Sequence, residues 1–458
     1  MTALITRNPA RPDEVVAEVP RLRGYGVEAV VDAAAQAQRV WEGDAPLRAD
    51  ALHRWAQAIE ADAAALARLM SQEVGKPLRE AAAEVGRAAA IVRFYSQVVF
   101  DSYGEHLPSA PDRHLFVRRR PLGTVLAICP WNFPVAIPVW KLAPALAYGN
   151  AAIFKPASAA VGVAQRLYEL GRDIFPPGVL AFAPMEAEDV FVLLQDPRIS
   201  GVSFTGSTEV GRRIIARAAD TGTPVQAEMG GQNASIVLDD ADLPHAAATI
   251  ADAAMGYAGQ KCTATSRVIV LHAVAETFAR LLREAIESLV VGDPSNEHVD
   301  VGPVISRGSA EAVSTAVDGA LRRGAGLITG GRRLAEAGWY YAPTLVRVDA
   351  RLDPFVMEET FGPAAALLVA VSDDEAIEIA NGTRFGLSGA VFTTDLRRGL
   401  GVADRLHAGM IRVNGSTTGA DYWAPFGGER ASGYGPKEQG RAAREFYTRT
   451  QTLTVIGS

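Results

Sequence analysis

Hydrophobic side chains recur at two different spacings along this chain, and each spacing predicts a different kind of element. Between residues 47 and 74 they recur at the helical spacing, with Leu52 and Trp55 on one face. Gly75 and the proline soon after it do not continue a helix, so the predicted helix ends there. The same spacing predicts a second helix that runs to about residue 99.

From residue 115 onward, short apolar runs alternate with helical segments. The predicted strands are residues 115–120, 124–129, 151–155, 200–205, 234–238, 267–271, 364–371, 388–393 and 409–413, and the predicted helices include 159–171, 209–219 and 242–258. A turn at residues 121–123 makes the first two strands neighbours. Strands that alternate with helices are typical of parallel sheets covered on both faces. We therefore predict an α/β protein with two open-sheet domains that meet near Gly230.

Length, charge and histidine content narrow the possible partners. A chain of 458 residues is too long for one ordinary core, which agrees with two or three domains. Its net charge is -7 with Lys and Arg dispersed, which argues against nucleic acid and anionic membranes as main partners. The 7 histidines are scattered without ligand spacing, so we predict no metal site.

Cysteine usage and the N-terminal residues bear on where the protein works. Its 2 cysteines, Cys129 and Cys262, provide no disulfide framework and suit a reducing compartment. The first residues lack the apolar stretch of a signal peptide. The longest apolar region, residues 124–140, is interrupted by prolines and cannot be a spanning helix. We expect a cytoplasmic protein.

Glu228 and Cys262 are the first candidates for chemistry. Glu228 precedes a glycine pair, where the backbone can approach a ligand closely. Cys262 lies in a polar loop, and Lys261 beside it could lower its pKa if that side chain points toward the sulfur. A thiol nucleophile and a carboxylate base are the minimum for catalysis through a hydrolysable thioester. Each also has a bland explanation, as a surface acid or a small buried hydrophobe, and Cys129 fits the latter.

Three further segments could bind a ligand, and each has an ordinary structural alternative. Gly206 and Ser207 follow a strand and open a helix, where free N–H groups favour a phosphate, but Ser207 alone would more often only cap the helix. Lys155 ends a strand, where ligands of open α/β sheets gather, but a lone lysine is more often solvated. Asn132, held between two prolines, could donate to a developing oxyanion or satisfy its own turn.

Taken in order, these motifs resemble the aldehyde dehydrogenase superfamily over nearly the whole chain. The matching motifs are Pro-Trp-Asn132-Phe-Pro, Trp140-Lys-Leu-Ala-Pro-Ala-Leu, Gly149-Asn150, Lys155-Pro, Phe-Thr-Gly206-Ser207, Glu228-Met-Gly-Gly, Gly-Gln-Lys-Cys262, Glu358-Glu359-Thr-Phe361-Gly-Pro and Pro425-Phe-Gly-Gly428. Unrelated motifs would not fall in family order by chance. The bland explanations therefore lose most of their weight.

The resemblance implies the covalent oxidation of an aldehyde to its acid. Cys262 would attack the carbonyl, and Asn132 with the Cys262 backbone N–H would bind the oxyanion. Glu228 would then activate water to hydrolyse the thioester, and Lys141 is placed with these catalytic residues. The cofactor would be NADP or NAD, and the residues expected to bind it are Trp131, Lys155, Ser158, Gly206, Ser207, Glu359 and Phe361.

The family's three-part architecture also maps onto the chain. It implies two Rossmann-like open-sheet domains and a small β element for oligomerisation. The dinucleotide-binding domain would comprise residues 1–101 and 122–230, the catalytic domain residues 231–431, and the oligomerisation element residues 102–121 and 432–458. A homodimer or homotetramer is the assembly implied.

Two departures from the family pattern carry predictions about specificity. NAD-preferring members usually have a glutamate where this chain has Ser158, and a carboxylate there would repel the 2′-phosphate of NADP. We therefore expect NADP to be accepted at least as well as NAD. Oxidisers of acidic semialdehydes often have an arginine where this chain has Trp140.

With Trp140 in that position, an apolar wall is predicted for the substrate pocket. The residues expected to form it are Phe133, Trp140, Tyr257, Tyr422 and Trp423. An uncharged aromatic or medium-chain aldehyde is then the favoured substrate. The alternative is an acidic semialdehyde of the succinic or ketoglutaric type, because the loop from Cys262 to Arg267 resembles that of some such oxidisers.

Two other functions are compatible with part of the pattern. An acylating relative would pass the thioester to coenzyme A, but such enzymes generally lack the base, and Glu228 is present. A non-catalytic dinucleotide-binding relative would be expected to have lost Cys262, Glu228 or Asn132. All three remain.

Overall fold

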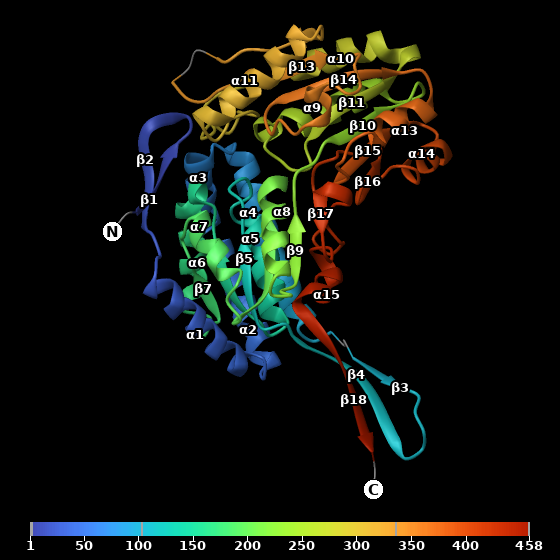
Figure 1. Ribbon diagram of the computed structural model, residues 1–458. Helices are drawn as coiled ribbons and strands as arrows, with labels where there is room; N and C mark the ends of the chain where they lie inside the picture. Colours follow the sequence, from blue (N-terminus) through green and yellow to red (C-terminus); the bar gives the residue numbers. More distant parts are fainter. Residues whose placement is uncertain (1–2, 102–103, 335–336, 457–458) are drawn as a thin grey trace.

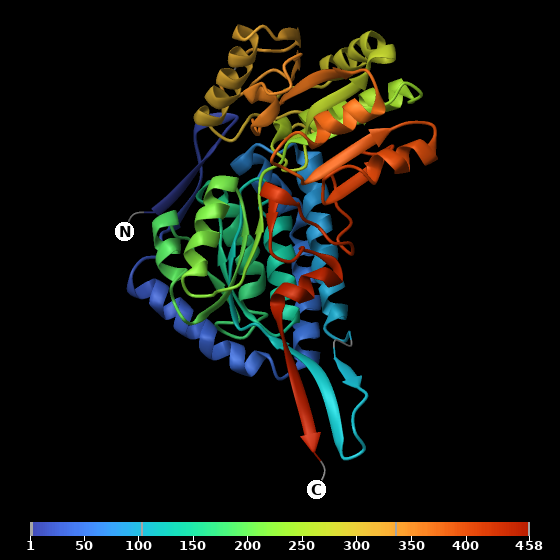
Figure 2. The same ribbon diagram turned by 45° about the vertical axis from the view of Figure 1, so that its right-hand side comes forward.

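The structure is a computed structural model that describes residues 3–101, 104–334 and 337–456 (Figure 1). Two large sheets, each with its own helices, lie one above the other in this view, and a narrow β arm projects from the lower half. The same arrangement is visible after a turn of 45° about the vertical axis (Figure 2). The prediction of an α/β fold with parallel open sheets is confirmed.

The lower half is built on a six-stranded sheet in the order β17-β9-β8-β5-β6-β7. Its strands are β5 (Thr124–Ile128), β6 (Ala151–Lys155), β7 (Leu180–Phe182), β8 (Ile199–Thr205), β9 (Val225–Glu228) and β17 (Gly433–Tyr434). All pairs are parallel except β17 with β9. The helices of this half are α1 (Tyr25–Trp41), α2 (Ala45–Ala61), α3 (Ala63–Val74), α4 (Leu78–Val98), α5 (Ala136–Ala147), α6 (Val161–Arg172), α7 (Ala187–Leu193) and α8 (Thr208–Ala219).

The upper half is built on a seven-stranded sheet in the order β12-β13-β14-β11-β10-β15-β16. Its strands are β10 (Asn233–Val237), β11 (Thr265–Leu271), β12 (Gly326–Thr329), β13 (Thr344–Arg347), β14 (Ala364–Ala370), β15 (Ser388–Phe392) and β16 (Met410–Val413). Only β12 runs antiparallel to its neighbour. The helices here are α9 (Leu243–Met255), α10 (Ala275–Glu287), α11 (Arg307–Arg322), α12 (Pro354–Met357), α13 (Asp373–Asn381) and α14 (Leu396–Ala403).

Two small antiparallel sheets complete the fold. The arm consists of β3 (Glu105–Leu107), β4 (Arg113–Pro121) and β18 (Thr448–Ile456), which follows the short helix α15 (Arg444–Tyr447). The strands β1 (Ala3–Asn8) and β2 (Arg11–Pro20) form a hairpin beside α3. The predicted domain limits remain a prediction, although β17, from the segment assigned to oligomerisation, pairs with β9 in the six-stranded sheet.

Two local expectations are wrong. The strands at 115–120 and 124–129 are not paired neighbours, because β4 pairs with β3 and β18 whereas β5 pairs with β6 and β8. The predicted helix at 47–74 is two helices, α2 and α3, separated at Asp62. Asp62 has φ -97° and ψ 6°, and Arg166 donates to both of its carboxylate oxygens at 3.0 and 2.6 Å, so this side chain is held outside a continuous helix.

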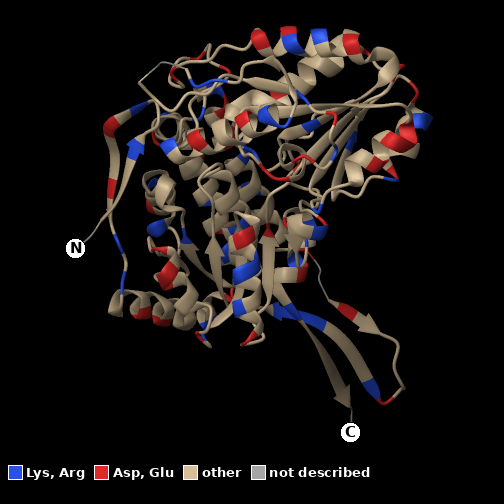
Figure 3. Ribbon diagram, turned by 45° about the horizontal axis from the view of Figure 1, so that its top comes forward, with Lys and Arg blue, Asp and Glu red and all other residues tan. Residues whose placement is uncertain are grey.

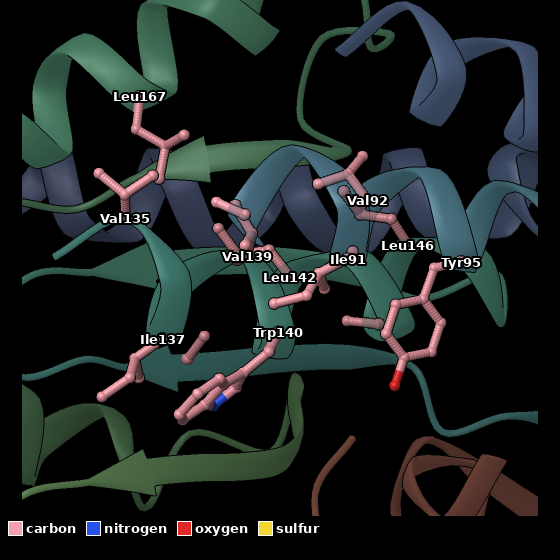
Figure 4. Close-up of a cluster of buried hydrophobic side chains, with 14 of the residues drawn as sticks. Ile91, Val92, Tyr95, Val135, Ile137, Val139, Trp140, Leu142, Leu146 and Leu167 are labelled. Carbon is pink, nitrogen blue, oxygen red and sulfur yellow. The ribbon is translucent and has the colours of Figure 1, made fainter. Parts of the chain in front are cut away.

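Helix α5 runs through the centre of the lower half and is buried along its whole length. It packs against α4, so that Ile91, Val92 and Tyr95 of α4 face Val139, Leu142 and Leu146 of α5 (Figure 4). Trp140 projects from α5 on the side away from α4 in the same view. The site therefore has a rigid support on this side.

Acidic and basic residues are interspersed over both halves of the molecule (Figure 3). Within the described ranges, no helix combines the length and apolarity needed to cross a membrane.

Candidate active site

The loop that carries Cys262 is shaped by three successive residues with positive φ. Tyr257 and Ala258 have φ of 51° and 52°, and Gly259 has φ of 66°. A Cβ on Gly259 would lie 2.1 Å from the carbonyl oxygen of Gly362, so only glycine fits there. The turn redirects the chain after α9 and presents Cys262 between the two halves of the molecule.

Cys262 lies where two cavities meet. One cavity, of about 270 Å³, is lined by Trp131, Asn132, Gly206, Ser207, Glu359 and Phe361. The other, of about 180 Å³, is lined by Phe133, Trp140, Phe426 and several residues of α4. Cys262 and Ile137 line both. Two groups bound in the two cavities would therefore both lie beside the Cys262 sulfur.

Asn132 comes from the lower half and reaches the loop of Cys262. Its side chain is buried, and Nδ2 donates a hydrogen bond of 2.9 Å to the carbonyl oxygen of Gln260. From the other side, Asn233 Nδ2 donates to the carbonyl oxygens of Cys262 and Ala264, each at 2.8 Å. The two amides hold the loop, and the structure brings Asn132 and Cys262 together as predicted.

The thiol of Cys262 is protonated at neutral pH. Burial raises its pKa to about 12, and the carboxylates of Glu359 and Glu228 add to the rise, while the N–H groups of Cys262 and Thr263 oppose it. Lys261, which the sequence offered as a possible activator, forms an ion pair of 2.9 Å with Glu80 instead.

Glu228 ends β9 and is buried. Gly428 N donates a hydrogen bond of 3.1 Å to its Oε2, and a Cβ on Gly427 would lie 2.3 Å from its Oε1. Glu228 is not among the described residues that line either cavity. Burial raises its pKa well above the usual range, and Glu438 adds to the rise, whereas Gly428, Lys437 and Lys141 oppose it.

Lys141 lies at the centre of a buried polar network. Its Nζ donates to Ser203 Oγ at 3.0 Å and forms an ion pair with Glu438. Ser203 Oγ in turn donates to Gln226 Oε1 at 3.1 Å. Lys141 is fully buried and is not among the described lining residues of the cavities, so it reaches the site only through Glu438 and its field on Glu228.

Glu359 and Phe361 enclose the larger cavity from the upper half. Gly231 N donates to Glu359 Oε1 at 3.1 Å, and a Cβ on Gly230 would lie 2.2 Å from Oε2, so the glycine pair makes room for this carboxylate. Burial raises the pKa of Glu359 to about 7. Phe361, at φ 50°, packs edge-on against Trp131 with ring centroids 5.7 Å apart.

The predicted dinucleotide residues of the lower half lie along the carboxyl edge of its sheet. Ser207 caps α8 by accepting from Val210 N at 3.4 Å, and Lys155 ends β6 with Ser158 just beyond it. Burial lowers the pKa of Lys155, which Glu186 opposes. A helix N-terminus and a lysine along this edge, with the Glu359 carboxylate lining the same cavity as Ser207, fit a dinucleotide.

The predicted pocket residues divide into two groups. Phe133 and Trp140 line the smaller cavity, and Trp140 lies 5.1 Å from the ring of Phe426. Tyr257 is fully buried behind Phe133, with its hydroxyl donating to Val74 O at 3.3 Å. Trp423 is 59% exposed, and like Tyr257 it is not among the described lining residues. The apolar wall is therefore smaller than predicted.

Helix α4 contributes residues that sequence reasoning missed. Glu80, Glu84 and Arg87 line the smaller cavity, at the spacing that puts them on one helical face. Glu80 pairs with Lys261, and Glu84 pairs with the buried Lys76. Arg87 has no hydrogen bond or ion pair with any described residue. A charged stripe on an otherwise amphipathic helix is the signal that could have identified this face.

A thiol shared by two cavities, one of them lined by a helix N-terminus and a carboxylate, is the arrangement expected of an oxidoreductase that uses a covalent intermediate. The profile of the aldehyde dehydrogenase family matches residues 2–453. The chain is 37% identical to alpha-ketoglutaric semialdehyde dehydrogenase of Bacillus subtilis over 456 residues, covering 98% of this chain and 93% of that protein. It is 38% identical to 3-sulfolactaldehyde dehydrogenase of Pseudomonas putida over 455 residues, with 98% and 93% covered.

Solved structures agree with the sequence comparisons. Betaine aldehyde dehydrogenase of Staphylococcus aureus, in complex with NAD+, superposes with a TM-score of 0.95 at 29% identity, covering 98% of this chain and 91% of that one. The chain belongs to the aldehyde dehydrogenase family. It is an NAD(P)-dependent enzyme, so the predictions of family, enzyme class and cofactor are confirmed.

Proposed function

We propose that this enzyme oxidises a short aldehyde bearing an acidic group to the corresponding carboxylic acid. The relatives named above act on alpha-ketoglutaric semialdehyde and 3-sulfolactaldehyde, both of which carry an acidic group. These names favour the alternative substrate class over the uncharged aromatic aldehyde that the sequence favoured. They do not decide it alone, because a betaine aldehyde dehydrogenase, whose substrate is cationic, is also similar.

Arg87 is the observation that carries this proposal. The two carboxylates of the smaller cavity are each paired with a lysine, so the unpartnered guanidinium of Arg87 leaves the cavity with a net positive charge. Burial lowers the pKa of Arg412, and the positive charge of Arg87 lowers it further, while Asp421 raises it. The electrostatic field of Arg87 therefore extends as far as Arg412. Such a site attracts a carboxylate or sulfonate and repels a cation.

Trp140 supports the same substrate class in spite of its apolar ring. Its buried Nε1 makes no hydrogen bond to any described residue, and the residue lines the cavity. An indole N–H is a donor only, so an acidic substrate group could satisfy it. Arg267, by contrast, is buried and donates to the carbonyl oxygens of Gln232, Ile379 and Ala380, so its guanidinium is already satisfied by the protein.

The reaction follows from the positions of three side chains. Cys262 loses its proton to solvent, its sulfur bonds to the aldehyde carbon, and the electron pair of the carbonyl double bond moves to oxygen. The oxygen that becomes negative accepts hydrogen bonds from Asn132 and the Cys262 N–H. One such donor contributes roughly two to three orders of magnitude in rate. The oxyanion re-forms the carbonyl double bond as a hydride leaves the same carbon, and a bound nicotinamide would supply the acceptor for that hydride. The carbon then remains on Cys262 as a thioester.

Glu228 is the base proposed for the second half of the reaction. It takes a proton from water, whose oxygen bonds to the thioester carbon as the bond to the Cys262 sulfur breaks. The acid leaves, and the proton held by Glu228 passes to the sulfur, which restores the thiol and the carboxylate. Glu228 must first move away from the Gly428 amide, since its carboxylate lies outside both cavities. Its presence argues against transfer to coenzyme A, and the open cavities beside Cys262 argue against a non-catalytic role.

We also propose that the arm joins copies of this chain into a homodimer or homotetramer. Val455 and Ile456 of β18 are 46% and 67% exposed on a strand that projects from the molecule (Figure 1). An exposed apolar strand edge favours pairing with another chain. Light scattering on the full chain and on Val455→Glu would test this, and an unchanged mass in the variant would count against the arm.

Succinic semialdehyde and butanal provide a matched test of the substrate proposal, because they share a chain length and differ in the carboxylate. We expect a higher kcat/KM for succinic semialdehyde in the native enzyme. Arg87→Met should lower it by about 10- to 100-fold, as expected for loss of one hydrogen bond to a charged group, and leave butanal unchanged.

Arg93→Met is the control, since Arg93 lies on the same helix but pairs with Glu60. A native preference for butanal would overturn the proposed substrate class. An equal loss for both aldehydes in Arg87→Met would overturn only the role of Arg87.

A further inference from the structure

Helix α5 begins directly after the turn that carries Asn132, and it has no capping side chain of its own. The carboxylate of Glu84, from α4, takes that place. Its Oε1 accepts hydrogen bonds from the N–H groups of Val135 and Ala136 at 3.0 and 2.9 Å. These are among the free donors at a helix N-terminus, where a carboxylate is also favoured by the helix dipole. Glu84 therefore fixes where α5, and the turn before it, begins.

The other oxygen of Glu84 forms an ion pair with the fully buried Lys76. The Lys76 ammonium also lies 3.7 Å from the ring centroid of Phe133 and 4.4 Å from that of Tyr257. Cation–π contacts of this kind are stronger away from water. Lys76 thus contacts the ring face of Phe133, the residue after Asn132. Glu84 holds the backbone N–H groups of Val135 and Ala136 just beyond it.

A buried ion pair such as that of Glu84 with Lys76 contributes little net stability to a fold. Removing two charges from water often costs as much as their attraction returns, and apolar residues of similar volume are frequently as stable. Burial lowers the pKa of Lys76, and Glu84 opposes this, so the charge of Lys76 depends on Glu84. Glu84 and Lys76 hold the turn that carries Asn132 in place, which two apolar side chains could not do.

We propose that Glu84 is a positioning residue for the oxyanion hole, acting through Asn132. The Asn132 amide is held at one end by its bond of 2.9 Å to Gln260 O, and its backbone is held through Glu84. Small displacements at a reacting centre cost up to about 100-fold in rate. This inference rests on the proposed role of Asn132 and does not depend on the proposed substrate.

Hydrolysis of p-nitrophenyl acetate by the protein without cofactor tests the inference, because ester attack by Cys262 also forms an oxyanion. The experiment is a double-mutant cycle with Glu84→Ala, Asn132→Ala and both together, corrected for the rate of Cys262→Ala. We expect Glu84→Ala to slow the acylation rate constant about 10- to 100-fold, with a smaller change in KM. In the Asn132→Ala background the same change should have almost no further effect.

Effects of Glu84→Ala and Asn132→Ala that multiply would overturn the inference, because the two residues would then act independently. A normal rate in Asn132→Ala would remove the oxyanion role itself, and the inference with it. If Glu84→Ala leaves Lys76 uncompensated and does not fold, Lys76→Met with Glu84→Ala gives the same cycle without a buried charge.

Glu73 provides a matched control for a merely structural effect. It is also buried, and it accepts hydrogen bonds from Gly162 N and Val163 N at the start of α6, each at 2.7 Å. Glu73→Ala should lower thermal stability in the same way as Glu84→Ala but leave ester hydrolysis by the folded protein unchanged. An equal loss of rate in both variants would show that general loosening explains the result, and would overturn the positioning role.

Discussion

The backbone amide of Gly428 donates a hydrogen bond of 3.1 Å to the carboxylate of Glu228, and this bond holds the proposed base beside a glycine turn. The turn has no side chain to exclude it, because a Cβ on Gly427 would lie 2.3 Å from its other oxygen. We therefore expect Glu228 to remain beside the site during attack on the aldehyde and to act only afterwards. The two halves of the reaction should therefore respond differently when it is changed.

Glu228→Gln should separate those halves. The amide keeps the size of the side chain but cannot take a proton from water, so the thioester should accumulate. A first turnover of NAD(P)H should remain, while steady-state turnover should fall by about 100- to 10,000-fold, the usual contribution of a general base. Stopped-flow absorbance measures both phases in one experiment. Loss of the first turnover as well would place Glu228 in the attack step instead.

The pH dependence of deacylation should follow the raised pKa of Glu228. Burial and Glu438 favour the protonated form, so the fraction of active base, and with it kcat, should increase as pH rises through that pKa. Lys437 opposes the rise, and it donates to Gly427 O at 2.7 Å beside the carboxylate. Lys437→Met should therefore shift the profile to higher pH.

Lys437→Arg keeps the positive charge and should leave the profile close to that of the native enzyme. The first turnover, measured at each pH, shows whether attack rather than deacylation has changed. A shift to lower pH in Lys437→Met would contradict the electrostatic explanation.

Motif order pointed to Asn132 and Cys262 as members of one site, and both line the same cavity, whereas Glu228 and Lys141 are not among its described lining residues. Asn132 and Cys262 do meet, because both lie where strands or helices of the two halves face each other. Tyr257 could not be placed in this way, since its positive φ turns the side chain behind Phe133. Trp423 lies on a loop whose exposure depends on tertiary packing that no local pattern reports.

The contribution of α4 to the cavity was also beyond sequence reasoning. Glu84 and Arg87 lie more than 170 residues before Cys262 in the chain, and they reach its cavity only because α4 packs along α5. A helical pattern identifies the faces of α4 but does not say which face meets another domain. Trp140 alone therefore says little about the charge of the cavity, on which the proposed substrate class depends.

Alkylation of Cys262 should report on the carboxylate of Glu359. The thiol has a pKa of about 12, raised first by burial and then by Glu359, so reaction with iodoacetamide should be slow at neutral pH and accelerate as pH rises. Glu359→Gln removes the second contribution, lowers the pKa of Cys262 and should speed alkylation at neutral pH several-fold. Mass spectrometry distinguishes Cys262 from Cys129. Cys129 is only 3% exposed, and burial raises its pKa to about 12 as well. Slower alkylation in Glu359→Gln would contradict this account.

Ser158 should set the preference between the two cofactors. It begins the short turn after Lys155 at the carboxyl end of β6, where the family resemblance places the adenosine ribose. Position 158 itself carries no carboxylate to repel a 2′-phosphate, and the Lys155 side chain offers a positive charge, so we expect kcat/KM with NADP at least equal to that with NAD. Ser158→Glu should restore the repulsion, raise the KM for NADP about tenfold or more and leave the KM for NAD unchanged or lower.

Ser158→Gln, which has the same length without the charge, separates repulsion from crowding. Equal losses in the Glu and Gln variants would show that space rather than charge decides, and a strong preference of the native enzyme for NAD would show that Ser158 does not decide at all.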